Sequence, residues 1–483
     1  MKRIFFFSFL FFIFTSINCY IKIPLKFYPC FVSDKLNITN IFSSIVMKQL
    51  YAKIEIGSPK QTLLIPLELD KNDFYISKYN SHISNEKYNS FGLKNFKEKL
   101  STSFKYTNEE QDKIYYNKNF QIASKAKDLF FFGDKSTELE FYLARNLSEE
   151  IPGEIGLQIH EVNKAYYTKE NSFLKKIKDN GIINNYIWTI LYNLENNDNK
   201  DIDGYLYIGD FLHNINSKEL ILKNIIFKEE SLISINANVY QNKVTTEFEM
   251  NKLYLYKNEN PKDIIKEVNL SKMYLSIKLD YNLGGIKASE IIRPYLEENV
   301  FTEQNKCHKD YFYYNNKYIF YYCDKNPTTL KNIRNNFPTM NFIHQEFNFN
   351  FIINLDDIIV EKDDYYLFLI FFGYSKNKYN WQLGRPFLNK YNFMIDQDGK
   401  KIYLYSKKEE EKDFLSPEIQ KQSESVIQKK AIIVFAIILI IILLIFGFVL
   451  LKKLNMTKIK KHKNIFEEDL NYSLSSGIEM IKK

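Results

Sequence analysis

Cysteine and histidine are scarce in this sequence. The chain of 483 residues contains four cysteines and six histidines, and the histidines are scattered along it. Neither these residues nor the aspartates and glutamates show the spacing of a metal-ligand set. We therefore expect no metal and no cofactor.

The folded part also lacks the strong positive charge that a nucleic-acid-binding protein would need. The formal net charge is +8, but six lysines lie between residues 452 and 463, close to the C-terminus. We expect these lysines to lie against anionic lipid headgroups. No nucleic-acid partner is expected.

Two apolar runs lie at the ends of the chain. Lys2 and Arg3 precede the first, over residues 4–14, and smaller polar residues follow it. This pattern predicts a signal peptide over 1–19. A first membrane span is the alternative, but the run is too short for one.

The second apolar run, over 431–451, has 21 residues without a charge and predicts a transmembrane helix. More lysines follow it than precede it, which places the tail over 452–483 in the cytosol. Residues 406–430 are rich in Lys, Glu, Gln and Ser and are expected to form a solvated stalk. We therefore predict a type I membrane protein of the secretory pathway or the cell surface, with most of the chain lumenal or extracellular.

An oxidising compartment makes a disulfide the expected fate of paired cysteines. Cys307 and Cys323 are 16 positions apart and form the most economical pair. Cys19 lies at the edge of the signal peptide, and the partner of Cys30 is left open. The lumenal sequons predict glycosylation at Asn37, Asn146 and Asn269.

The chain is organised around two stretches in which an apolar strand carries a carboxylate into a turn. The first, over 54–76, resembles the opening of pepsin-like aspartic peptidases, with the pattern I-G-T-P-x-Q, six residues, then D-T-G-S. The catalytic aspartate of the family falls on Glu68. A shift of two residues would place Asp70 there instead, but it would move Phe74 and Tyr75 off the apolar strand positions. The scaffold residues that match are Gly57, Pro59 and Gln61.

The second stretch, over 275–282, places Asp280 on the second catalytic aspartate of the family. Two further segments resemble family motifs: 151–158 resembles D-G-I-L-G-L-G, and 381–395 resembles W-x-L-G-x-x-F-[LI]-x-x-Y-x-x-F-D. Helices are expected over 173–177 and 288–296. The resemblance covers about residues 50 to 406.

The fold that this resemblance implies is all-β and bilobal, with a central cleft, to which the C-terminal transmembrane helix is added. The N-terminal lobe would cover 50–212 and the C-terminal lobe 213–405. Residues 20–49 would form an edge strand that ties the N-terminus to the sheet or, alternatively, a short prosegment. In this alignment Tyr106 falls on the tyrosine of the substrate-binding flap, but the flap glycines fall on Thr107 and Glu109.

The residues that take part in catalysis in this family are replaced in this sequence. The family needs two carboxylates that share one proton across a bound water. In the first turn Thr, Gly and Ser fall on Leu69, Asp70 and Lys71, and in the second Thr and Gly fall on Tyr281 and Asn282. Lys71, turned inward, would lower the pKa of a catalytic carboxylate.

We therefore predict a pseudopeptidase that binds a peptide or protein in the cleft between the lobes. The first alternative is an active acid endopeptidase that uses Glu68 and Asp280. The second is a structural surface component whose cleft has no ligand. The sequence leaves the oligomeric state open.

Overall fold

The computed structural model describes residues 20–30, 37–78, 94–116, 119–145, 153–159, 172–192, 202–215, 227–240, 243–257, 264–269, 275–314, 316–344, 346–373 and 381–405. The predicted signal peptide, stalk, transmembrane helix and tail lie outside these ranges. Within them, no helix combines the length and apolar character needed to cross a bilayer.

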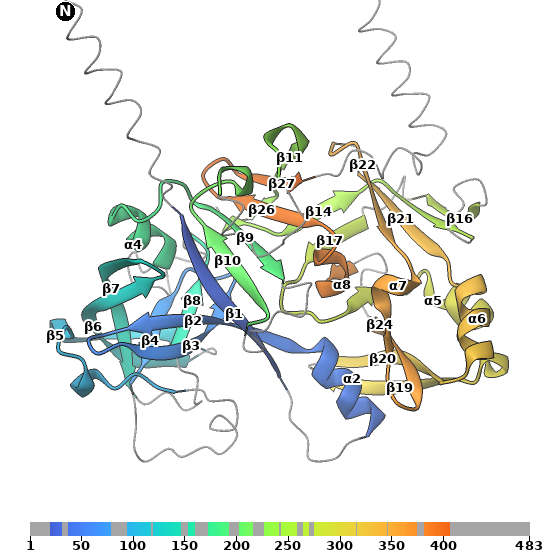
Figure 1. Ribbon diagram of the computed structural model, residues 1–483, viewed down its shortest axis with the longest axis horizontal. Coiled ribbons are helices and arrows are strands. Elements are labelled where there is room, and N and C mark those ends of the chain that lie inside the picture. The colour runs from blue at the N-terminus through green and yellow to red at the C-terminus, as the bar shows by residue number, and fades with distance from the viewer. Residues whose placement is uncertain are drawn as a thin grey trace, which may run out of the picture. The chain divides into compact units, whose positions relative to one another are not determined.

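The structure is mainly β, as predicted, and its largest sheet has 13 strands (Figure 1). Their order is β11 (Leu232–Asn236), β27 (Lys401–Tyr405), β26 (Asn392–Asp396), β9 (Ile187–Tyr192), β10 (Gly204–Ile208), β1 (Ile21–Pro29), β2 (Lys48–Ile56), β3 (Gln61–Glu68), β8 (Gly153–Gly156), β4 (Phe74–Ser77), β7 (Lys135–Arg145), β6 (Asn119–Phe132) and β5 (Lys105–Tyr116). A further pairing of β2 with β6 closes six of these strands, from β2 to β6, into a mixed barrel.

A second sheet has eight strands. Its path is β14 (Glu247–Met250), β17 (Leu275–Leu279), β25 (Trp381–Leu383), β18 (Ile286–Ala288), β24 (Tyr365–Gly373), β20 (Asn316–Asp324) and β19 (Cys307–Tyr314), with β23 (Ile359–Glu361) beside β24. The smaller sheets contain β16 (Ile264–Asn269), β15 (Lys252–Tyr256), β21 (Thr339–His344) and β22 (Phe349–Ile353), and the pair β12 (Val239–Tyr240) and β13 (Lys243–Val244).

The helices in the described ranges are short. They are α2 (Ile38–Val46), α4 (Phe173–Asp179), α5 (Arg293–Asn299), α6 (Pro327–Asn336), α7 (Leu355–Ile358), α8 (Arg385–Leu388) and the 3-10 turns η1 (Glu98–Leu100), η2 (Leu212–Asn214), η3 (Glu229–Ser231) and η4 (Glu303–Asn305). Helix α4 confirms the prediction over 173–177. The helix predicted over 288–296 begins later, at α5, because residues 286–288 form β18 and Pro294 fits the first helical turn.

Strand β1 lies inside the large sheet, so the predicted edge position is wrong. Residues 21–25 pair with β10, and residues 25–29 pair with β2. Its side chains alternate between buried and half-buried along most of its length, which suits a strand with one face of the sheet packed on the core. The N-terminal segment is therefore part of the sheet.

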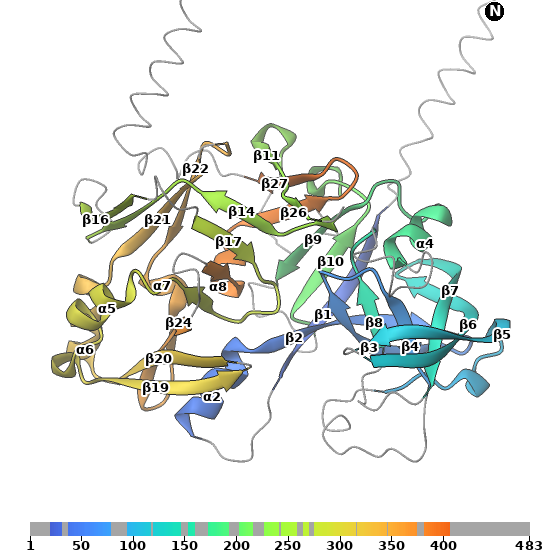
Figure 2. The same ribbon diagram turned by 180° about the vertical axis from the view of Figure 1, so that it is seen from behind.

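Helix α2 continues this segment and lies beside β19 in both views (Figures 1 and 2). Asn37 caps its N-terminus by accepting a hydrogen bond from the backbone N–H of Asn40. The ring of Phe42 is fully buried and stacks on Phe320, with ring centres 4.1 Å apart. The helix thus joins the N-terminal segment to the eight-stranded sheet.

The predicted disulfide between Cys307 and Cys323 is present. The two cysteines face each other across strands β19 and β20. Cys30 is half-buried and takes no part in this bridge. The disulfide closes a loop of only 16 positions, and so short a loop limits the chain entropy that the bridge removes from the unfolded state.

Replacing both Cys307 and Cys323 by alanine is expected to lower the free energy of unfolding by roughly 2 kcal/mol, because the open hairpin gains chain entropy when unfolded. Thermal unfolding with and without a reductant measures this effect. Cys30→Ala is the matched control, since it removes a thiol but no bridge. A loss of stability no larger than that of Cys30→Ala would contradict the expectation.

Candidate functional site

The same arrangement of four strands occurs twice and carries one carboxylate each time. In the first carboxylate motif, β3 is parallel to β8, β8 is antiparallel to β4, and β4 is parallel to β7. In the second carboxylate motif, β17, β25, β18 and β24 repeat these three relations in the same chain order. Glu68 ends β3, and Asp280 directly follows β17. The two residues therefore occupy matching places.

A glycine lies against the turn in each motif. A Cβ added to Gly156 would lie 2.3 Å from the carbonyl oxygen of Lys71, and one added to Gly384 would lie 2.1 Å from that of Leu283. These carbonyls belong to the third residue after Glu68 and the third after Asp280. Because only glycine allows so close an approach, both turns are held by backbone packing.

The start of strand β2 connects the two turns. The backbone N–H groups of Leu50 and Lys48 donate to the side-chain and backbone oxygens of Asn282, at 2.9 and 3.3 Å. Between them, the side-chain amide of Gln49 donates to the backbone oxygen of Leu67 at 3.5 Å, and its nearness lowers the pKa of Glu68. Three consecutive residues thus reach both turns. Nothing in the sequence pattern around Gln49 indicated this role.

The two carboxyl groups are half-buried and lie close enough for their charges to interact. Burial raises the pKa of Glu68; the charge of Lys71 opposes this, and Asp280 is among the groups that raise it further. Burial also raises the pKa of Asp280, opposed by Lys278 and by the hydrogen bond from the backbone N–H of Asn282 at 3.1 Å. Each carboxylate therefore has a lysine nearby.

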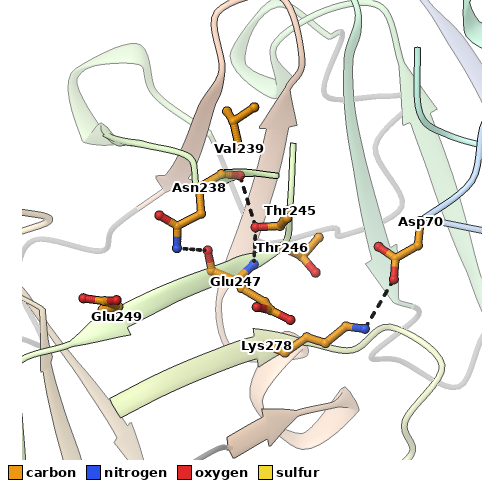
Figure 3. A pocket seen from close by; sticks show the side chains of 8 residues that line it. All are labelled: Asp70, Asn238, Val239, Thr245, Thr246, Glu247, Glu249 and Lys278. Atoms are coloured by element: carbon orange, nitrogen blue, oxygen red, sulfur yellow. Dashed lines mark hydrogen bonds and ion pairs between the residues drawn. The ribbon is translucent and has the colours of Figure 1, made fainter. Parts of the chain in front are cut away.

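Both lysines have a second acidic neighbour. The Nζ of Lys71 lies 2.8 Å from an oxygen of Glu154, a buried residue of β8 whose pKa is raised by burial to about 7 despite the lysine. The Nζ of Lys278 lies 3.4 Å from an oxygen of Asp70, and their dashed contact is drawn in Figure 3. The direct partner of Lys71 is Glu154, while its charge still lowers the pKa of Glu68.

Leu69 and Tyr281, which follow the two carboxylates, form no side-chain hydrogen bond with each other. Leu69 has no side-chain hydroxyl, and the ring of Tyr281 is fully buried beside Trp188, with ring centres 5.9 Å apart. Among the described residues, the Tyr281 hydroxyl has no hydrogen-bond partner. The Tyr192 hydroxyl donates a hydrogen bond to the backbone oxygen of Tyr281 at 3.2 Å. This bond ties the turn that carries Asp280 to strand β9.

The aromatic side chain found near the carboxylates is Tyr314, at the end of β19. Burial raises its pKa, and the charges of Cys30, Asp280 and Glu68 raise it further. The chain contains 36 tyrosines, so composition gave no signal for this one. Tyr106, the predicted flap residue, lies in β5 with 39% of its side chain exposed and packs edge-on against Phe104. Its contact with a substrate stays a prediction.

The predicted glycosylation sites have different surroundings. Asn37 is exposed as the N-cap of α2. Asn269 ends strand β16, and Asn146 lies outside the described ranges. Attachment of a glycan to any of the three stays a prediction.

Comparison with models of protein families and with curated proteins finds no match for this chain. We therefore infer the function from the motifs in the sequence and from the geometry around Glu68 and Asp280.

Proposed function

We propose that this chain is a homologue of the pepsin-like aspartic peptidases that binds a peptide or an extended protein segment at Glu68 and Asp280 without cleaving it efficiently. One observation carries the proposal. The two carboxylate motifs bring Glu68 and Asp280 together at the start of matching turns, while Leu69 and Tyr281 follow them where the family has threonine. The bilobal fold with a central cleft is part of this proposal.

The site suits recognition of a peptide backbone. A buried carboxylate forms a strong hydrogen bond with a peptide N–H, because one partner is charged and little water competes. A protonated carboxyl group donates to a peptide carbonyl, and the raised pKa of both groups favours this form. A pair of such groups can therefore hold an extended backbone through both kinds of contact.

The same geometry opposes catalysis. The glutamate side chain is one methylene longer than aspartate, and Lys71 and Gln49 both favour the charged form of its carboxylate by lowering its pKa. Asp280 is held by its own turn and has Lys278 nearby. The protonation of each carboxylate therefore depends on its own neighbouring residues and not only on the other carboxylate. A displacement of about 1 Å from the productive geometry costs roughly two orders of magnitude in rate.

We also propose that the protein is anchored as a type I membrane protein, with the site on the lumenal or extracellular side. The uncharged run over 431–451 and the lysines after it support this orientation. The disulfide agrees with an oxidising compartment.

The test is a cleavage and binding assay with the full-length chain in detergent micelles. A denatured protein mixture is incubated with the protein from about pH 3 to about pH 7, beside the Asp280→Asn variant as background. We expect no product that depends on Asp280. We also expect the protein to retain peptides from a random decapeptide library and Asp280→Asn to retain them about tenfold less, since a charged hydrogen-bonding partner is lost.

Cleavage that disappears in Asp280→Asn would show instead an active endopeptidase that uses Glu68 and Asp280. A higher rate in Glu68→Asp would strengthen that result. Neither cleavage nor retained peptide, from a folded sample, would leave a structural surface component.

A further inference from the structure

A pocket of about 510 Å³ opens beside the two turns (Figure 3). Asp70, two residues after Glu68, lines one side of it, and Lys278, two residues before Asp280, lines another. Strand β14 supplies Glu247 and Glu249. A ligand residue next to the one held by Glu68 and Asp280 would therefore face this pocket.

The pocket is acidic although the chain is basic. Of the described residues that line it, three are carboxylates (Asp70, Glu247 and Glu249) and one is an ammonium group, Lys278, so these residues together carry a net charge of −2. Among the described residues, Glu249 has no ion-pair partner. The remaining lining includes Val239, 40% exposed, which offers apolar surface for the hydrocarbon part of a long side chain.

The described residues of the pocket form no site for a single metal ion. In the ranges that the structure describes, no group of three acidic, histidine or cysteine residues could coordinate a metal. In Figure 3, Asp70 and Glu249 lie on opposite sides of the drawn residues, and they come from different segments of the chain. Such spacing fits a cation on a long or planar group better than a monatomic ion.

One wall of the pocket is held in place by its own hydrogen bonds. The side-chain amide of Asn238 donates to the backbone oxygen of Glu247 at 3.1 Å, and the hydroxyl of Thr245 donates to the backbone oxygen of Asn238 at 3.1 Å. These contacts fix the backbone of Glu247 against the β12 and β13 hairpin. These contacts use the backbone of Glu247, so its carboxylate can interact with a ligand or with Lys278.

Lys278 and Asp70 form an ion pair at the opposite wall. Its distance of 3.4 Å, between Nζ of Lys278 and an oxygen of Asp70, is longer than a strong charged hydrogen bond. The side chain of Asp70 is 48% exposed at this wall. An arginine guanidinium, with five donors, can contact several acceptors at once.

We propose that this pocket binds a basic side chain, arginine or lysine, of the peptide held at Glu68 and Asp280. The proposal depends on the proposed function, because it names the class of peptide that the same site takes. The positive charge would lie beside Glu247 and Glu249, and the hydrocarbon stem would lie against Val239.

The experiment uses the full-length protein in micelles and the random decapeptide library as the probe. Peptides retained by the wild-type protein are sequenced, and the best one is made with each basic residue replaced by its neutral analogue: citrulline for arginine and norleucine for lysine. We expect enrichment of arginine or lysine at one position. The neutral analogue there should weaken binding about tenfold, and salt should reduce this difference.

The variant Glu247→Gln/Glu249→Gln should reduce the tenfold difference to threefold or less. Glu138→Gln, an exposed glutamate of β7, is the matched control and should leave it unchanged. Retention without basic enrichment, or a difference that the double variant does not change, would overturn this inference alone. Failure to retain any peptide would overturn the proposed function and this inference together.

Discussion

The variant Phe42→Ala is expected to lose about 3 to 5 kcal/mol of the free energy of unfolding. The Phe42 ring is fully buried and touches three rings of the eight-stranded sheet: Phe320, Phe312 and Phe371, with ring centres 4.1, 5.4 and 6.3 Å away. Alanine would leave a cavity among rigid strands that cannot close around it. Unfolding in guanidinium, followed by tryptophan fluorescence, measures the loss.

The matched control is Tyr313→Ala, which removes an aromatic ring that is 70% exposed on β19. Its free energy of unfolding should stay within about 0.5 kcal/mol of the wild-type value. A loss below about 1 kcal/mol in Phe42→Ala would mean that α2 is not part of the folded core. The segment over 20–49 would then be a candidate for removal, as a prosegment would be.

Glu154→Gln is expected to change how stability depends on pH. The pKa of Glu154 is raised by burial from 4.5 to about 7 in the folded protein. The folded state therefore binds the proton more tightly than the unfolded state does. The stabilisation from this proton is complete below the unfolded value and is lost as the pH rises through about 7.

The size of this effect follows from the pKa difference. At about 1.4 kcal/mol for each pH unit of difference, the wild-type protein should lose roughly 3 kcal/mol of stability from this group between about pH 4.5 and pH 7. In Glu154→Gln this loss should be absent, because the amide does not titrate and still offers Lys71 an oxygen. Denaturant unfolding at a series of pH values measures the two profiles.

Two half-buried carboxyl groups, Glu68 and Asp280, contribute in the same direction, so the difference between the two proteins is the informative quantity. Glu138→Gln is the control, because Glu138 and its partner Lys127 are both exposed, at 49% and 42%. Its pH profile should follow the wild-type profile. If Glu154→Gln also followed it, Glu154 would not hold its proton near neutral pH.

The sequence predicted a large part of the fold and of the site because its motifs are local. The motif over 54–76 predicted that an apolar strand ends at Glu68, and the structure ends β3 there. Gly156, in the motif over 151–158, and Gly384, in W-x-L-G, lie where the backbone approaches a carboxylate-bearing turn too closely for a Cβ. The cysteine spacing predicted the disulfide, since Cys307 and Cys323 flank one hairpin.

Contacts between distant residues were not predictable in this way. Asp70 and Lys278 are 208 positions apart, and Lys71 and Glu154 are 83 positions apart. In a chain with 66 basic and 58 acidic residues, many such pairs are conceivable and composition favours none. Tyr314 and Gln49 likewise reach the site only because β19 ends there and β2 begins there.

The sequence by itself determined the local events: where strands end, which turns carry Glu68 and Asp280, and which cysteines lie opposite each other. These follow from side-chain alternation, glycine and short spacing, which act over a few residues. The tertiary structure decided that β1 lies inside the sheet, that α2 joins the eight-stranded sheet, and which lysine lies beside which carboxylate. The physical reason is that burial and charge pairing depend on all the segments that meet at one place, and no single segment contains that information.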